Sequence, residues 1–127
     1  MTRLLKFRAW NNHKRKMLPV FSINFENTSK KHPERKYVIR HGSTRKDWDD
    51  DVVVMEFTGL LDKSGKEIYE GDVVKLSERY ELREVIFEEG TFGWKSLVFP
   101  IITPFCTVDL TDTEVIGNIY ENPELLK

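Results

Sequence analysis

One stretch of the chain, residues 57–74, does most to limit the folds open to it. It reads FTGLLDKSGKEIYEGDVV, in which glycine interrupts the apolar residues at three positions. Residues 62–65 (DKSG) have the composition of a turn, with glycine at the position that most easily takes a positive φ. Residues 73–76 (VVKL) follow the last glycine and begin with two β-branched side chains. The stretch therefore predicts a strand, a turn, a connection and a second strand, which is typical of a β-rich domain.

The first 26 residues are predicted to form an N-terminal β-hairpin segment. Residues 6–10 alternate polar and apolar side chains, residues 17–25 supply the returning strand, and the asparagines between them favour a turn. Pro19 has no N–H to donate to a sheet, so it indicates an edge strand or a bulge. Residues 27–51 are mostly polar and are predicted to be an insertion of loops around a short strand at residues 36–40.

Residues 52–127 are predicted to form the core domain, a small β-barrel. Residues 52–57 are nearly all apolar and rich in valine, which suits a central strand. A hairpin is expected over residues 83–97, and a last strand with a glycine bend over residues 114–119. Asn-Pro at the start of residues 122–126 predicts a short C-terminal helical turn. The fold class is therefore mostly β: an N-terminal hairpin plus a small antiparallel, SH3-like barrel, an analogy of fold that carries no function.

The composition excludes several classes of protein. Hydrophobic residues make up 39% of the 127, enough for one core. The single cysteine, Cys106, can form neither an internal disulfide nor a multi-cysteine zinc site, and it is expected to be a buried, inert thiol. No apolar run approaches the ~20 residues of a membrane span, and the N-terminus does not resemble a signal peptide. The sequence therefore predicts a cytoplasmic protein without a membrane partner.

Charge is distributed very unevenly along the chain. Residues 1–46 contain 13 lysines and arginines but only two acidic residues, a net charge of +11. Residues 47–127 contain seven basic and 19 acidic residues, a net charge of −12. Such a split favours either attraction between the two halves, within one chain or between subunits, or binding of a polyanion by the basic half.

Three runs of residues together resemble the YopX family of phage and prophage proteins. They are residues 6–17, beginning KFRAW, residues 58–74, and residues 115–126 (VIGNIYENPELL), in family order. Residues 26–51 match no pattern of the family. The resemblance implies a small phage- or prophage-encoded cytoplasmic protein of mostly β fold that forms homo-oligomers. It supplies no biochemical activity and no catalytic or binding residue to carry over.

No constellation of residues indicates an enzyme. The run at residues 58–74 lacks the spacing of a phosphate-binding loop, and a strand rather than a helix is expected after it. The acidic run at residues 47–51 lacks the glycine and distal glutamate of a calcium loop and is expected to be solvated. The three histidines lie in polar segments without ligand spacing, and no serine has the context of a nucleophile. We therefore expect no catalytic residue, no cofactor and no metal.

The basic residues between positions 14 and 46 are the candidate contact residues. They are interleaved with the aromatic residues Tyr37 and Trp48. Cations that contact phosphates and aromatic rings that stack on bases are the ingredients of sequence-tolerant nucleic-acid binding. The same residues could instead form a contact between subunits. The set is Lys14, Arg15, Lys16, Lys30, Lys31, Arg35, Lys36, Arg40, Arg45 and Lys46.

The near balance of +11 and −12 favours the contact between subunits, because a dedicated nucleic-acid binder usually keeps a basic surplus. The sequence thus predicts a non-enzymatic accessory protein that acts through homo-oligomerisation and binding of a phage or host protein. The alternative is a nucleic-acid-binding module that uses residues 14–46.

Overall fold

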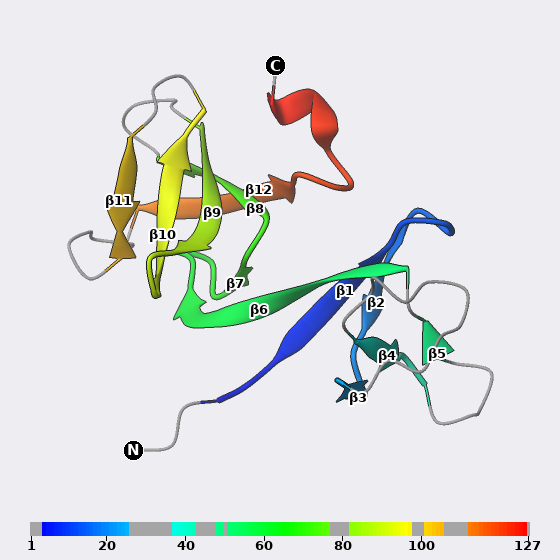
Figure 1. Cartoon of the computed structure of the whole chain (residues 1–127). Coiled ribbons are helices and arrows are strands. Elements are labelled where there is room, and N and C mark those ends of the chain that lie inside the picture. Colours follow the sequence, from blue (N-terminus) through cyan, green and yellow to red (C-terminus); the bar gives the residue numbers. More distant parts are fainter. Residues whose placement is uncertain are drawn as a thin grey trace. The chain divides into compact units, whose positions relative to one another are not determined.

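The computed structural model shows a mostly β protein, as predicted (Figure 1). The chain divides into two compact units: unit 1 comprises Met1–Lys6 and Glu56–Lys127, and unit 2 comprises Phe7–Met55. Helical structure among the described residues is confined to the short 3-10 helix η3 (Pro123–Leu126), which confirms the predicted C-terminal turn. The residues described are 4–25, 37–42, 48–49, 51–76, 82–97, 101–105 and 112–126.

Unit 2 begins with the predicted hairpin, formed by β1 (Phe7–Asn11) and β2 (Lys16–Pro19). Strand β2 is the edge strand of its sheet, as Pro19 indicated. The returning strand was predicted to continue to residue 25, and this is wrong. Because Pro19 cannot donate to the ladder, the chain leaves the sheet there and forms a separate strand, β3 (Ser22–Asn24).

A second small sheet completes unit 2. Strand β3 pairs with β4 (Val38–Arg40), which lies within the short strand predicted at residues 36–40. Strand β4 also pairs with the two-residue β5 (Trp48–Asp49), so the order is β3-β4-β5. Much of the predicted polar insertion, residues 27–51, lies outside the described residues. Its described parts include β4 and β5.

Strand β6 (Val52–Leu61) is an interior strand, as its valine-rich sequence predicted. Its first residues belong to unit 2, and from Glu56 onward it belongs to unit 1, where it pairs with β7 (Glu67–Tyr69). The register shifts between Phe57 and Leu61, and Gly59, with φ 85°, lies in this interval. Gly59 therefore lies at an irregularity within a strand.

Unit 1 contains a five-stranded antiparallel sheet in the order β11-β10-β9-β8-β12, which curls into a half-barrel (Figure 1). The predicted hairpin is confirmed as β9–β10, and its two-residue loop has positive φ at both Glu89 (52°) and Gly90 (78°). Positive φ at both loop residues is the type I′ turn that suits the twist of a hairpin. The strands are β8 (Asp72–Leu76), β9 (Leu82–Glu88), β10 (Thr91–Ser96), β11 (Ile102–Pro104) and β12 (Thr113–Asn118).

The core of unit 1 lies on the inner face of this sheet. Its buried side chains come from strands β7, β8, β9, β10 and β12, with Leu76 and Phe105 packed against them at its margin. Ile68 is fully buried in this core. The buried members are Ile68, Val74, Val85, Trp94 and Val115.

Candidate polyanion-binding site

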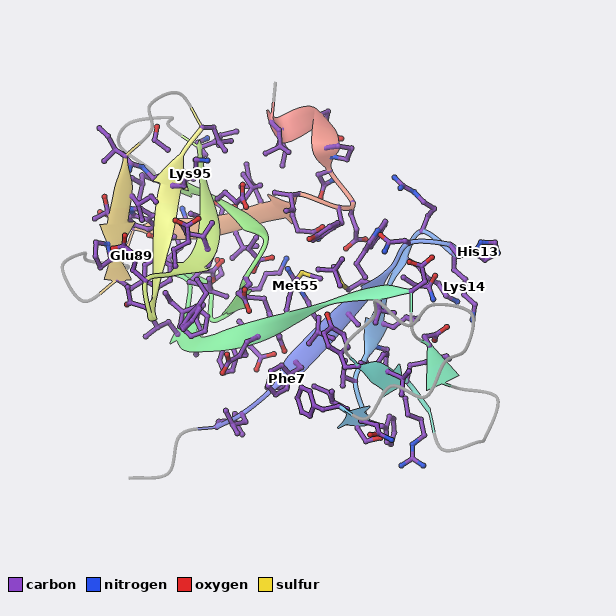
Figure 2. The ribbon with its side chains drawn as sticks, in the orientation of Figure 1. Phe7, His13, Lys14, Met55, Glu89 and Lys95 are labelled. Atoms are coloured by element: carbon purple, nitrogen blue, oxygen red, sulfur yellow. The ribbon has the colours of Figure 1, made fainter. Side chains whose placement is uncertain are left out.

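Four of the ten candidate residues fall within the described part of the chain. Lys14, Arg15 and Lys16 are exposed at the turn between β1 and β2, together with His13 (Figure 2). We call residues 13–16 the basic tip. Arg40 is half-buried on β4, in the other sheet of unit 2, where its carbonyl accepts a hydrogen bond from Phe21 N at 2.7 Å. The remaining candidates lie outside the described residues: Lys30, Lys31, Arg35, Lys36, Arg45 and Lys46.

Asn11 shapes the basic tip. Its side chain is buried, and its Oδ1 accepts hydrogen bonds from the main-chain N–H groups of His13 (2.9 Å) and Lys14 (2.7 Å). Its carbonyl oxygen accepts a third bond, from Arg15 N at 2.9 Å. Asparagine is suited to this role because its short side chain readily caps the main chain of a turn. Since these three N–H groups are already bonded, the basic tip offers an anion its side chains rather than its backbone.

Two described residues of the acidic run, Asp49 and Asp51, anchor the base of the basic tip. Asn11 Nδ2 donates to Asp49 Oδ1 at 3.0 Å, and Asp49 Oδ2 lies 2.6 Å from His41 Nδ1. Asn12 donates to Asp51 twice, from its main-chain N and from Nδ2, both at 3.0 Å. The sequence predicted a solvated acidic loop, but the Asp49 side chain is only 15% exposed. These partners are 38 and 39 residues apart, and no local signal in the sequence points to them.

Arg15 is held against an aromatic ring that the sequence did not single out. Its guanidinium carbon lies 5.5 Å from the centroid of the buried Trp10 ring, within the range of a cation–π contact. Its backbone has φ 55°, an uncommon conformation for a residue other than glycine. Tyr37, which the sequence grouped with the basic residues, instead accepts a hydrogen bond from Val54 N at 3.2 Å through its hydroxyl.

The longest of the three family-like runs contributes to a buried turn instead of a binding loop. The carboxylate of Asp62 accepts main-chain hydrogen bonds from Ser64 (2.8 Å), Lys66 (2.9 Å) and, on β12, Val115 (2.9 Å). Burial raises the pKa of Asp62, but these donors outweigh it and hold the pKa below its ordinary value. Gly71 joins the same two runs, because its carbonyl accepts a bond from Ile119 N at 2.9 Å.

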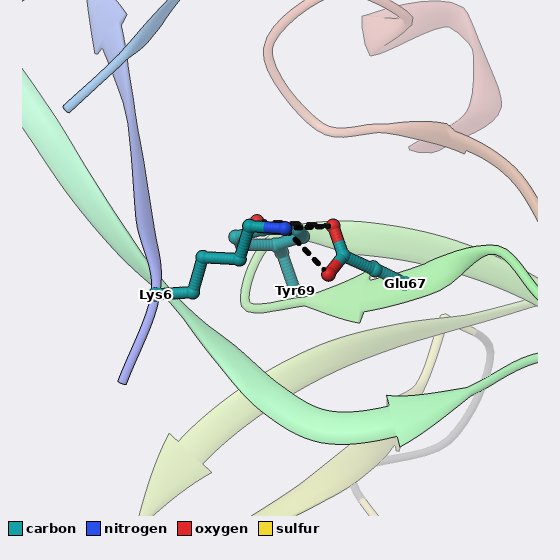
Figure 3. A network of polar contacts seen from close by, with 3 residues as sticks. All are labelled: Lys6, Glu67 and Tyr69. Atoms are coloured by element: carbon teal, nitrogen blue, oxygen red, sulfur yellow. Dashed lines mark hydrogen bonds and ion pairs between the residues drawn. The ribbon is translucent and has the colours of Figure 1, made fainter. Parts of the chain in front are cut away.

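The first run is joined to the second by an exposed network (Figure 3). Lys6 Nζ lies 2.8 and 3.1 Å from the two carboxylate oxygens of Glu67, and the Tyr69 hydroxyl lies 3.5 Å from Glu67 Oε1. The hydrogen bond to Glu67 raises the pKa of Lys6. Lys6 of the first run and Glu67 of the second therefore bond to each other, which gives both side chains a structural role.

The described residues contain no group of three or more His, Cys, Asp or Glu side chains that could hold a metal ion. Cys106 lies outside them, so the prediction that it is buried stays a prediction. In the part of the chain with assigned structure, no helix combines the length and the apolar character needed to cross a bilayer.

Comparison with known proteins gives a consistent result. The YopX protein family model matches residues 6–127. The crystal structure of protein EF1440 from Enterococcus faecalis is similar, with 28% identity, a TM-score of 0.63, and coverage of 99% of this chain and 100% of that chain. Protein yopX from Bacillus subtilis shares the fold at 21% identity, with a TM-score of 0.62 and the same coverage. No curated protein matches the sequence.

Proposed function

Because the chain belongs to the YopX family, we propose that it is a non-enzymatic accessory protein of a phage or prophage. It acts in the cytoplasm by assembling with copies of itself and by binding a phage or host protein. The supporting observation is that opposite charges divide along the boundary between the two units. Unit 2 contains 11 basic and six acidic residues, a net charge of +5, whereas unit 1 contains nine and 15, a net charge of −6. Complementary charges of this size attract neighbouring copies.

Two hairpin turns provide the contact residues in this proposal. The basic tip of unit 2 presents exposed cations, and the β9–β10 turn of unit 1 presents the exposed carboxylates of Glu88 and Glu89 (Figure 2), which we call the acidic tip. Beside the acidic tip, Phe87 and Phe92 stack edge to face with ring centroids 4.9 Å apart, and Phe87 is 48% exposed. An acidic tip flanked by an exposed ring can both attract a cation and cover its aliphatic stem.

The mass of the particle in solution tests this proposal. Light scattering behind a sizing column should give an oligomer at low salt that loosens at high salt, because exposed charge pairs are screened. The triple variant Lys14→Ser, Arg15→Ser and Lys16→Ser should have a lower mass at low salt. A matched control removes the same charge from unit 1 at three exposed lysines and should keep the mass of the wild type: Lys63→Ser, Lys66→Ser and Lys95→Ser.

Charge reversal tests which turn meets the basic tip. Glu88→Lys with Glu89→Lys should lower the mass, as should Lys14→Glu with Lys16→Glu, because each places like charges opposite one another. Mixing the two reversed proteins should restore a complex between them, since the charges are again opposite. If neither pair of substitutions changed the mass, these two turns would not form the contact between subunits.

A further inference from the structure

We propose that unit 2 also carries a binding site for single-stranded nucleic acid. Phosphates contact the cations of the basic tip, and bases stack on the exposed rings of Phe21 and Phe25. This inference shares the basic tip with the assembly proposed above, but the two rings take no part in that assembly, so the two proposals can fail separately.

The cations of the basic tip are well placed for a phosphate backbone. They occupy consecutive exposed positions, and the turn that presents them is fixed by the three hydrogen bonds to Asn11 and by the bonds to Asp49 and Asp51. A fixed turn loses little main-chain freedom when it binds. The net charge of +5 on unit 2 adds long-range attraction for a polyanion.

Two large aromatic side chains of the same unit lie mostly in solvent. Phe21 is 65% exposed and Phe25 is 74% exposed. Their positions are nevertheless defined: Phe21 N donates to the carbonyl of Arg40 at 2.7 Å, and the Phe25 ring meets the ring of Tyr37 edge to face at 6.4 Å. Aromatic rings usually bury their surface in a core or an interface, so two exposed rings indicate a surface that binds.

The spacing of cations and rings suits a strand of a few nucleotides. Strand β2 begins at Lys16 and ends at Pro19, and Phe21 follows two positions later, so the two residues are separated by at most about 17 Å along the chain. Sites of this kind accept from about four nucleotides upward, with the backbone on cations and the bases on rings. Bases in a duplex are stacked on one another and are not available to the rings. The site therefore favours single strands over duplexes.

Fluorescence anisotropy with a labelled oligothymidylate of ~15 nucleotides tests the site, with a duplex of the same length for comparison. The whole chain should bind the single strand more tightly, with an affinity that falls linearly with salt on logarithmic axes. Lys14→Ser with Lys16→Ser should lower the slope of that line by about 0.7 for each phosphate that is no longer neutralised. Phe21→Ser with Phe25→Ser should weaken binding about tenfold per ring and leave the slope unchanged.

Three control variants test whether stacking needs an aromatic ring, whether it needs the rings of unit 2, and whether it depends on the proposed assembly. Phe21→Tyr with Phe25→Tyr should restore affinity because tyrosine also stacks, and Phe87→Ser, which removes an exposed ring from unit 1, should change nothing. Glu88→Lys with Glu89→Lys should break the assembly and keep the preference for single strands. Loss of that preference alone would overturn the inference without touching the proposed assembly.

Three results would overturn the nucleic-acid site. The first is no binding at low salt up to about 100 μM protein. The second is equal affinity for duplex and single strand with no effect of the phenylalanine substitutions. The third is displacement of the oligonucleotide by polyglutamate at equal charge, which would assign the surface to an acidic protein partner instead.

Discussion

At the scale of single residues, Asp62 shows how a buried charge can hold a fold together. Its carboxylate receives three main-chain hydrogen bonds, and its pKa is lowered as a result. A lowered pKa in the folded state means that the stabilisation is complete above pH ~4 and is lost as the pH falls through the folded pKa. The bonds to Ser64 and Lys66 close the turn, and the bond to Val115 ties that turn to β12.

We expect Asp62→Asn to lower the free energy of unfolding by about 2 kcal/mol at pH 7, because an amide cannot accept all three bonds as a carboxylate does. The deficit should be smaller at pH 3 than at pH 7, because the carboxylate binds a proton as the pH falls through its lowered pKa. Urea unfolding of both proteins at the two pH values measures the difference. Asp112→Asn, at an exposed acidic residue, is the control, and an equal effect there would contradict this account.

The turn residue Glu89 should be replaceable with a gain in stability. Its φ of 52° places an ordinary side chain in the left-handed region, where Asn is tolerated better and where Asn-Gly is the preferred pair for a type I′ turn. Glu89→Asn should therefore raise the free energy of unfolding by about 1 kcal/mol. Thermal unfolding measures this. Glu88→Asn, in the adjoining strand, should give no gain, and a gain of the same size there would point to charge instead of backbone conformation.

At the scale of elements, strand β11 depends on a glycine in its neighbour. A Cβ added at Gly93 of β10 would lie 2.5 Å from the carbonyl oxygen of Thr103, a backbone atom that cannot move alone. Gly93→Ala should therefore separate β11 from β10 and cost about 1–3 kcal/mol. Hydrogen exchange at Ser96 N, which bonds to the carbonyl of Ile101 at 3.1 Å, should accelerate. Exchange at Gly71 N, bonded to Val85, should stay slow, and Lys95→Ala should affect neither.

Local sequence predicted the elements whose partners are close along the chain. The β1–β2 and β9–β10 hairpins follow from strand patterns interrupted by turn residues, and η3 follows from Asn-Pro at its start. The pairing of β3 with β4 could not be predicted, because it depends on where the chain runs after Pro19. The two-residue β5 is too short to leave a pattern.

The candidate site was predictable to a similar extent. Its cations were visible in the sequence, whereas the cap provided by Asn11 and the anchors Asp49 and Asp51 were not. Those anchors lie nearly forty residues further along the chain and are brought in by the fold alone. From the sequence, Trp10 is an ordinary strand residue, and its contact with the Arg15 guanidinium becomes visible only in the structure.

At the scale of the whole molecule, opposite charge on the two units makes assembly sensitive to pH. Acidic solution removes negative charge from unit 1, so the attraction should weaken as the pH is lowered from about 7 to about 4. Burial raises the pKa of Glu70 and of Glu84, so these two carboxylates begin to lose their charge at a higher pH than an ordinary glutamate does. Light scattering across this range should show a falling mass while circular dichroism stays constant. The triple serine variant of the basic tip should show no such change, and a wild-type mass independent of pH would contradict the charge mechanism.

The hydrogen bonds from Val115 N to the Asp62 carboxylate and from Ile119 N to the Gly71 carbonyl have a consequence for how relatives of this protein are compared. Residues of the second and third runs bond to one another, whereas the basic tip and the exposed phenylalanines take part in neither of these two bonds. Two members can therefore keep the second and third runs and still differ at the basic tip, which lies near the end of the first run, and at Phe21 and Phe25. Relatives of this protein should therefore be compared at residues 13–25 separately from the two runs that bond to each other.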